Sequence, residues 1–209
     1  MTLRDIRSDD WADTPVVALL LHGYGADERD LAPLAGALGL AVPWASLRGP
    51  LDLPGGGAAW FTITTPGNPE PEPVVAATDE IWTWVDEHVG PAARVVPVGF
   101  SQGGLMATQL LRTRPERVAA TVVLGGFVLG APQPGDDRLA ETRPPAFWGR
   151  GADDQVIAEP AVARTASWLP RHTDLVARVY PGLGHGIHAA EVRDVADFLA
   201  AHASAAVRS

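Results

Sequence analysis

Val95–Pro115 has the sequence VVPVGFSQGGLMATQLLRTRP. With Arg94 it begins as a short, mostly apolar run typical of a buried strand, and from Gly103 onward it has the character of a helix. Between these parts, Gly99–Gly103 fits G-x-S-x-G, whose glycines let the backbone turn sharply enough to lift a serine hydroxyl clear of a sheet. The segment therefore predicts a strand (Arg94–Val98), a tight turn and a helix, with Ser101 at the apex of the turn.

Ser101 is the candidate nucleophile. The alternative is a glycine-rich turn with an incidental serine, but the flanking strand and helix are the context that the motif requires. A serine hydroxyl is weakly nucleophilic until a base removes its proton and a third group orients that base. Where this motif is catalytic, the acid and then the histidine follow the serine along the chain. Both are therefore expected C-terminal to Ser101.

His185 has the best position for the base among the six histidines. It lies between two glycines in the loop that follows the apolar run Asp174–Tyr180. In open α/β sheets, ligands bind beyond the carboxyl ends of the strands. His188, the nearest rival, is interpreted as a polar residue at the start of the last helix, and His22 as a structural hydrogen-bonding residue.

The acid is expected in the loop Arg150–Ile157, which follows the apolar strand Pro145–Gly149 and contains Asp153 and Asp154. A carboxylate there can accept the imidazole N–H, fix its tautomer and stabilise the imidazolium. Successive side chains of an extended loop point in different directions, so only one of the two should face His185. The residues alone leave the choice between them open.

An oxyanion site is expected in Leu19–Ala26, where LLLHGYGA ends an apolar strand in a glycine-rich loop. Acyl transfer needs backbone N–H groups aimed at the carbonyl oxygen on which negative charge develops. One donor should be the main chain of Gln102, the residue after the nucleophile, and the other should come from this early loop, at Tyr24. An ordinary strand-to-helix turn is the alternative for this motif by itself.

Taken together, these motifs resemble the phospholipase/carboxylesterase family of α/β-hydrolases, which includes bacterial carboxylesterases and acyl-protein thioesterases. They occur in the family's order along nearly the whole chain: LLLHGYGADERDL (Leu19–Leu31), Trp60-Phe61, GFSQGG (Gly99–Gly104), GADDQVI (Gly151–Ile157) and YPGLGHGI (Tyr180–Ile187). The resemblance implies that Asp154 is the acid, because the family's acid lies in a G-x-x-D-x-V-V-P run. It also implies hydrolysis of short- or medium-chain carboxylic esters.

Two residues depart from the family pattern. Ala158 stands where the family usually has proline, and Trp148 replaces the histidine common before the glycine of that strand. Neither change touches the three proposed catalytic residues, so both bear on substrate preference more than on the chemistry.

The whole chain, 209 residues, fits a single domain that buries a substantial core. It has no cysteine, which excludes disulfides and a thiol nucleophile. Its net charge of −9 argues against a nucleic-acid partner. The polar N-terminus lacks the apolar stretch of a secretory signal, and Val16–Leu21 is too short to cross a membrane. We therefore expect a cytoplasmic protein without integral membrane association.

Helical and strand patterns alternate along the chain, which predicts a mostly parallel central sheet flanked by helices. Helices are expected at Glu28–Leu38, Pro73–Val89, Gly103–Arg112, Pro160–Trp168 and Ala189–Ala201, and strands at Val16–Leu21, Val42–Arg48, Arg94–Val98, Val118–Leu124, Ala146–Gly149 and Leu175–Tyr180. The interval Gly125–Pro144 is too short for a helical cap and holds Asp136, Asp137 and Glu141, interpreted as surface charge on a loop. The prediction is a minimal α/β-hydrolase fold without a cap domain, with an open and shallow site.

Four aromatic residues are candidate walls of the substrate cleft, with core packing as the alternative for each: Trp60, Phe61, Phe127 and Trp148. The proline-rich segment Pro66–Pro73 is expected to be a surface loop, with a rigid edge of the cleft as the second interpretation. Trp82 and Trp84 are two apart in a predicted helix and cannot share one face. At least one is expected to face away from the main core, which leaves room for a homodimer contact.

The sequence thus predicts a serine carboxylesterase that needs no metal or organic cofactor and acts on a small-molecule ester. The alternatives within enzymes are an acyl-protein thioesterase and a lysophospholipase. From a different class, a non-catalytic receptor on the same fold would retain the pocket but not need all three of Ser101, Asp154 and His185.

Overall fold

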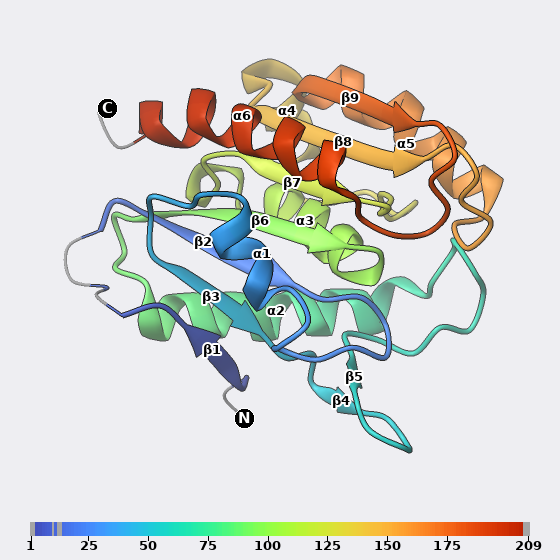
Figure 1. Cartoon of the computed structure of the whole chain (residues 1–209), viewed down its shortest axis with the longest axis horizontal. Coiled ribbons are helices and arrows are strands. Elements are labelled where there is room, and N and C mark those ends of the chain that lie inside the picture. The colour runs from blue at the N-terminus through green and yellow to red at the C-terminus, as the bar shows by residue number, and fades with distance from the viewer. Residues whose placement is uncertain (1–2, 10, 12–13, 207–209) are drawn as a thin grey trace.

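The computed structural model describes residues 3–9, 11 and 14–206. Its centre is a seven-stranded twisted sheet of order β1-β3-β2-β6-β7-β8-β9 (Figure 1). These strands are β1 (Asp5–Arg7), β2 (Val16–Leu21), β3 (Trp44–Leu47), β6 (Arg94–Phe100), β7 (Thr121–Leu124), β8 (Pro145–Gly151) and β9 (Asp174–Tyr180), and a separate pair is formed by β4 (Leu51–Asp52) and β5 (Ala58–Ala59). All neighbours in the large sheet are parallel except β1, which pairs antiparallel to β3.

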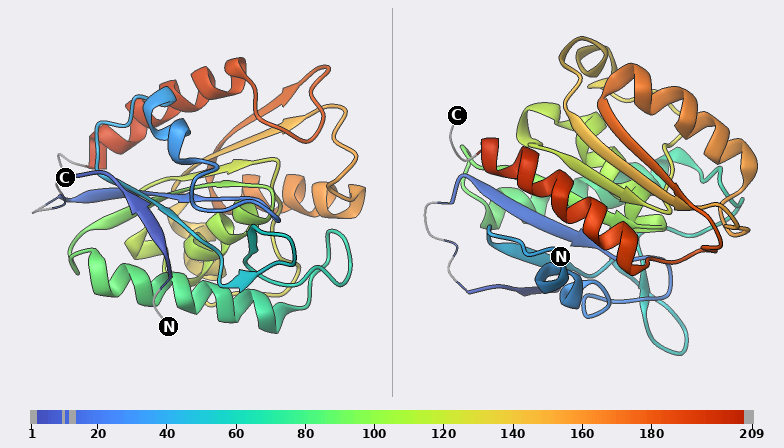
Figure 2. Two further views of the ribbon diagram at one scale, coloured as in Figure 1. Left: turned by 60° about the horizontal axis from the view of Figure 1, so that its bottom comes forward. Right: turned by 45° about the horizontal axis from the view of Figure 1, so that its top comes forward.

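Helices cover both faces of the sheet, as the two views of Figure 2 show. One face carries α1 (Ala32–Ala37) and α6 (Ala189–Ala206), and the other carries α2 (Pro71–His88), α3 (Gln102–Thr113), α4 (Asp136–Thr142) and α5 (Glu159–His172). Strand β2 shows why. Val17, Leu19 and Leu21 enter the core against α2 and α3, whereas Val16 and Leu20 enter the core against α1 and α6. The predicted fold class is therefore confirmed: a mostly parallel sheet buried on both faces.

The interval Gly125–Pro144 contains α4, a helix of seven residues that the sequence did not reveal. Gly135, just before α4, donates its N–H to the carbonyl oxygen of Arg112 near the end of α3. Because Ser101 lies at the opposite end of α3, α4 does not cover it. Asp136 is also no free surface charge, since its carboxylate takes two hydrogen bonds from the buried Arg112 guanidinium, at 2.8 and 2.7 Å.

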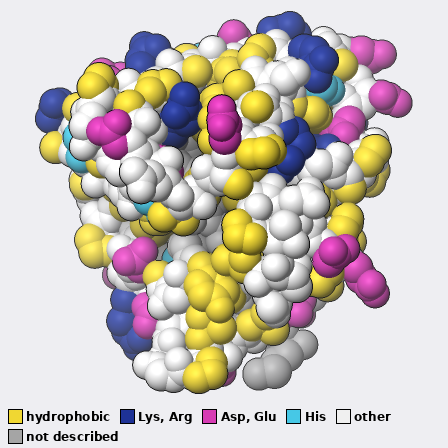
Figure 3. All heavy atoms as spheres, turned by 90° about the vertical axis from the view of Figure 1, so that its right-hand side faces the viewer, with side chains coloured by type: hydrophobic (Ala, Val, Ile, Leu, Met, Phe, Trp, Pro, Cys, Tyr) yellow, Lys and Arg dark blue, Asp and Glu magenta, His cyan; other side chains and the backbone are white. Residues whose placement is uncertain are grey.

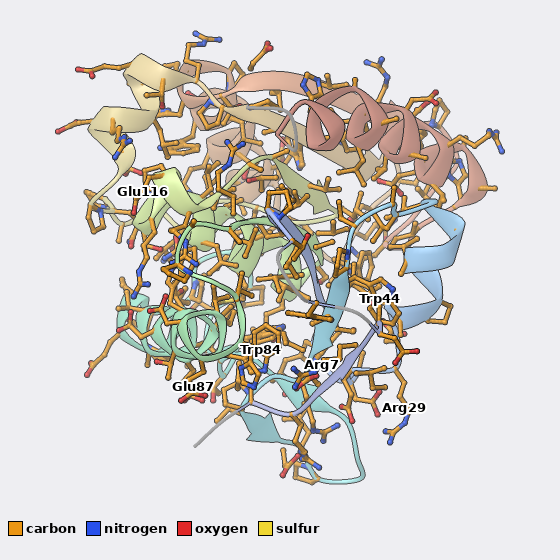
Figure 4. The ribbon with its side chains drawn as sticks, turned by 90° about the vertical axis from the view of Figure 1, so that its left-hand side faces the viewer. Arg7, Arg29, Trp44, Trp84, Glu87 and Glu116 are labelled. Carbon is orange, nitrogen blue, oxygen red and sulfur yellow. The ribbon has the colours of Figure 1, made fainter. Side chains whose placement is uncertain are left out.

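Trp82 and Trp84 are both buried, which corrects the prediction that one of them faces away from the core. Trp82 donates its indole N–H to the Thr113 hydroxyl at 2.8 Å. Trp84 lies under the N-terminal segment (Figure 4), where the Arg7 guanidinium carbon is 5.6 Å from its ring centroid and Trp11 contacts it edge-on at 5.8 Å. The N-terminal segment therefore supplies a second apolar surface for α2, and neither tryptophan offers an exposed dimer contact.

The strand order places one crevice at a defined point. The chain passes from β2 to β3 on one side and later to β6 on the other, so the order reverses between β2 and β6. Ligands of open α/β sheets bind at such a reversal, beyond the carboxyl ends of the strands. The loop after β2 carries Tyr24, and the turn after β6 carries Ser101.

Candidate active site

Ser101 sits on a strained turn between β6 and α3. Its backbone has φ 55° and ψ −115°, a left-handed conformation that is rare for residues other than glycine. The flanking glycines are required by close approach: a Cβ on Gly99 would overlap the carbonyl oxygen of Gly103, and one on Gly103 would overlap the carbonyl oxygen of Leu21. The turn therefore packs directly against the ends of β2 and α3, and it holds the Ser101 side chain at the carboxyl edge of the sheet.

The structure brings Ser101, His185 and Asp154 together in one hydrogen-bonded chain. His185 Nε2 lies 2.8 Å from Ser101 Oγ, and His185 Nδ1 lies 2.8 Å from Asp154 Oδ2. The three residues come from the carboxyl ends of β6, β8 and β9. An imidazole held in this way can accept the hydroxyl proton at Nε2 while the carboxylate holds its Nδ1–H.

The geometry also separates the two neighbouring aspartates. The Asp154 side chain is 6% exposed, and its Oδ1 accepts the main-chain N–H groups of Val156 and Ile157 at 2.9 and 3.2 Å. Burial acts to raise the pKa of Asp154, but the hydrogen bonds from His185 and from these two N–H groups outweigh it and lower the pKa below its ordinary value. Asp153 is exposed and is fixed by its main-chain N–H, which donates to the carbonyl oxygen of Leu183.

His185 is packed between the turn after β6 and the loop after β7. Its ring centroid lies 4.9 Å from that of Phe100, and a Cβ on Gly125 would lie 3.4 Å from its Cε1. The rival histidines have structural contacts. His188 Nδ1 accepts the main-chain N–H of Glu191 at 3.3 Å in the first turn of α6. His22 is fully buried and spans Gly23 O and Gly49 N, so burial lowers its pKa.

The glycine-rich loop after β2 lies against the Ser101 turn, since a Cβ on Gly23 would be 3.4 Å from Ser101 Cβ. The loop is held by a short pairing with β5, in which Gly25 N–H donates to Ala58 O and Ala58 N–H donates to Ala26 O. Gln102 is the first residue of α3, where N–H groups have no partner within the helix. Both main-chain donors proposed from the sequence, at Tyr24 and Gln102, therefore belong to segments that adjoin Ser101.

The side chain of Gln102 has a contact that sequence reasoning missed. It is 3% exposed; its Oε1 accepts the Trp60 N–H at 2.9 Å and its Nε2 donates to Phe61 O at 2.7 Å. The amide therefore joins the start of α3 to the segment after β5. The one signal in the sequence that could have placed this segment near the site is the family motif Trp60-Phe61.

An apolar cavity of about 190 Å³ opens beside Ser101 and Gln102. Its other lining residues come from the segment after β5 and from the loops after β7 and β8: Phe61, Ile63, Thr65, Pro66, Gly67, Pro69, Phe127, Val156 and Ile157. The proline-rich segment thus forms one edge of the cavity. Figure 3 shows this end of the molecule, where hydrophobic side chains gather among both acidic and basic ones. A second cavity, of about 500 Å³ between α1 and α6, is lined by His185 and Phe100 but not by Ser101.

Two of the four aromatic residues expected to wall the cleft lie elsewhere. Phe61 and Phe127 line the cavity. Trp60 is 1% exposed in the core and donates its indole N–H to His22 O, and Trp148 packs with Val128 and Leu169 and donates to Gly126 O. Phe61 is itself 2% exposed and belongs to the same buried cluster as Trp60, so it lines the cavity from the edge of the core.

Within the described ranges, no three His, Cys, Asp or Glu side chains are grouped so as to hold a metal ion. No helix in the described part of the chain combines the length and apolar character that a membrane span requires.

The fold and this site define an α/β-hydrolase, in which a serine at a strained strand-to-helix turn meets a histidine and a carboxylate from later strands. A family model described as phospholipase/carboxylesterase matches residues 2–203. The chain therefore belongs to the phospholipase/carboxylesterase family of esterase- and thioesterase-type α/β-hydrolases.

Relatives of known name agree with this family. The chain is 24% identical to acyl-protein thioesterase 1 of Debaryomyces hansenii over 151 residues, 67% of this chain and 65% of that protein. It thus spans less than two thirds of that relative's length. Among solved structures, the Bacillus cereus carboxylesterase has a TM-score of 0.77 at 21% identity, covering 95% of this chain and 94% of that one. The Mesorhizobium loti carboxylesterase has a TM-score of 0.75 at 23% identity, covering 90% of each.

Proposed function

We propose that this protein is a serine carboxylesterase acting on short- to medium-chain carboxylic esters through an acyl-enzyme on Ser101. The observation that carries the proposal is the hydrogen-bonded chain Ser101–His185–Asp154 at the mouth of an apolar cavity. A serine hydroxyl is activated when a base lies within hydrogen-bond reach of it and a third group orients that base. The cavity beside the nucleophile supplies a place for the acyl part of the ester.

In the proposed reaction, Ser101 Oγ attacks the carbonyl carbon while His185 Nε2 takes the hydroxyl proton. The main-chain N–H groups of Tyr24 and Gln102 stabilise the resulting oxyanion. His185 then gives its proton to the leaving alcohol oxygen as the ester bond breaks, and the acyl group stays on Ser101. Water is deprotonated by the same imidazole and attacks the acyl-enzyme. The imidazole then returns the proton to Ser101 Oγ as the acyl bond breaks, which releases the carboxylic acid. Asp154 holds the imidazole tautomer throughout.

Thioesters and lysolipids are the competing substrate classes within this family. The similarity to acyl-protein thioesterase 1 keeps the thioester in the comparison, because the same acyl-enzyme forms whether oxygen or sulfur leaves. The cavity of about 190 Å³ favours a short acyl chain over a long one. A cytoplasmic location and a small ester as substrate belong to the same proposal.

The test is turnover of p-nitrophenyl esters of increasing acyl length beside a matched thioester and a lysolipid. We expect hydrolysis of the short esters by the wild-type protein and its loss in Ser101→Ala. A preference for the thioester or lysolipid at equal acyl length would replace the ester assignment. No turnover of any of the three, together with binding of short esters, would instead support a non-catalytic receptor.

A further inference from the structure

Arg164, in the middle of α5, joins two adjacent loops that both contribute to the wall of the apolar cavity. Its Nε donates to Val128 O at 2.9 Å, and its Nη2 donates to Gly67 O at 2.7 Å. Gly67 lines the cavity from the proline-rich segment, and Phe127, next to Val128, lines it from the loop after β7. Arg164 itself does not line the cavity. One guanidinium therefore ties together two cavity walls that are about 60 residues apart in the sequence.

Neighbouring contacts make this cross-link stiff. Thr165, the next residue of α5, accepts the Val128 N–H on its hydroxyl at 3.0 Å. Gly67 has φ +72°, and a Cβ on it would lie 2.9 Å from Ala158 Cβ and 3.0 Å from Ala161 Cβ. The Gly67 loop is thus pressed onto the start of α5. The guanidinium is the charged donor that holds it there, and charge-assisted hydrogen bonds are stronger than neutral ones.

The environment of Arg164 disfavours the charged form of its guanidinium. Burial lowers the pKa of Arg164, and the positive charge of Arg112 adds to this effect. Arg164 keeps its two hydrogen bonds to carbonyl oxygens in this unfavourable environment, which fits a role in holding the two cavity walls together.

We infer that Arg164 is a positioning residue that sets the longest acyl chain the Ser101 cavity accepts. The inference rests on the proposed function, since it places the acyl group in this cavity. The cavity of about 190 Å³ favours short acyl chains. Short chains fit while Arg164 holds the walls, and longer chains require the Gly67 loop to move.

The experiment measures kcat and KM for p-nitrophenyl esters from two to twelve acyl carbons with the wild-type protein, Arg164→Met and Arg164→Lys. In the wild type, kcat/KM rises about fourfold for each methylene buried, peaks near four to six carbons and then falls. Arg164→Met removes both donors and moves the peak to longer chains by at least two carbons, through lower KM for the long esters. Acetate turnover stays within about twofold of the wild type.

Arg164→Lys reaches only one of the two carbonyl oxygens, so it gives an intermediate shift and replaces Arg164→Met where that variant does not fold. Arg171→Met is the matched control, because Arg171 is an exposed residue of the same helix, and its profile stays that of the wild type. An Arg164→Met or Arg164→Lys profile with an unmoved peak, or a loss by one common factor for all esters, would overturn the inference and leave the proposed function standing. Absence of turnover by the wild type would overturn both.

Discussion

Asp154 Oδ2 lies 2.8 Å from His185 Nδ1, and the other oxygen of the same carboxylate is fixed by two main-chain N–H groups of its own loop. The carboxylate is therefore oriented before it meets the imidazole. It has no freedom to rotate its second oxygen toward His185 without losing those two bonds. This relationship identifies one member of the Asp153–Asp154 pair as the partner of the imidazole.

Asp154→Asn should lower kcat/KM for p-nitrophenyl acetate by roughly 10³- to 10⁴-fold, because an amide that donates to Nδ1 stabilises the wrong imidazole tautomer. Asp153→Asn is the control, since that side chain is exposed, and it should stay within a few-fold of the wild type. Steady-state kinetics of both variants checks this. The assignment fails if Asp153→Asn is the crippled variant.

Ser101→Gly should be more stable than Ser101→Ala by about 1 kcal/mol, because glycine adopts φ 55° without the strain that alanine retains. Glycine normally costs about 1 kcal/mol relative to alanine in a helix. Ala163→Gly, at an exposed position of α5, should show that ordinary loss. Urea unfolding of the four proteins, including the wild type, measures the difference. If glycine lowers the free energy of unfolding relative to alanine equally at positions 101 and 163, the turn at Ser101 stores no strain.

Gln102→Ala should destabilise the protein by about 2–4 kcal/mol, because it leaves the Trp60 N–H and the Phe61 carbonyl oxygen buried without partners. It should also weaken hydrolysis of six-carbon esters more than of acetate, since Phe61 is a cavity wall. Gln109→Ala, in the same helix and equally buried, should leave the ratio of the two activities unchanged. Unfolding and kinetics together check this. If Gln102→Ala keeps the wild-type ratio of the two activities, the Gln102 side chain does not shape the cavity.

Glu191 should make the protein less stable as pH rises from about 5 to 8. Neither of its carboxylate oxygens has a hydrogen-bond partner among the described residues. Burial raises its pKa to about 7 from 4.5, and the charge of Asp194 adds to this increase. Between those values the folded chain holds a proton that the unfolded chain has lost, so stability falls with pH through this window and levels off above it. Asp154, whose pKa is lowered from 3.8, acts below this window.

Glu191→Gln removes that dependence. The free energy of unfolding of the variant, relative to the wild type, should increase by about 2–3 kcal/mol between pH 5 and pH 8. Glu141→Gln, at an exposed position of α4, should give a flat difference over the same range. Urea titrations at four pH values supply the measurement, and a flat difference for Glu191→Gln would contradict the prediction.

The sequence predicted those parts whose signals are local. Strand β2 was predicted at its observed bounds because an unbroken apolar run between polar segments has one interpretation in a parallel sheet. The turn at Ser101 carries its own glycine signature. By contrast, β1, α4 and the burial of Trp84 depend on which distant segment covers which surface. No spacing rule reveals that Arg7 and Trp11 lie over α2.

The site divides in the same way. The order of Ser101, the acidic loop and His185 along the chain brought the three residues to one edge of the sheet. Whether Trp60 or Phe61 lines the cavity depends on how the bent segment after β5 packs, and Arg164 carries no sequence signal because its partners are carbonyl oxygens. Main-chain acceptors leave no trace in a sequence.

The most direct measurement is covalent labelling with a serine-directed fluorophosphonate, followed by mass spectrometry of the digested chain. A single adduct on the peptide that contains Ser101 is expected in the wild type, with labelling abolished in Ser101→Ala and slowed by orders of magnitude in His185→Ala. An unlabelled Ser101 in the folded protein, or an adduct on another residue that persists in Ser101→Ala, would contradict the role proposed for Ser101.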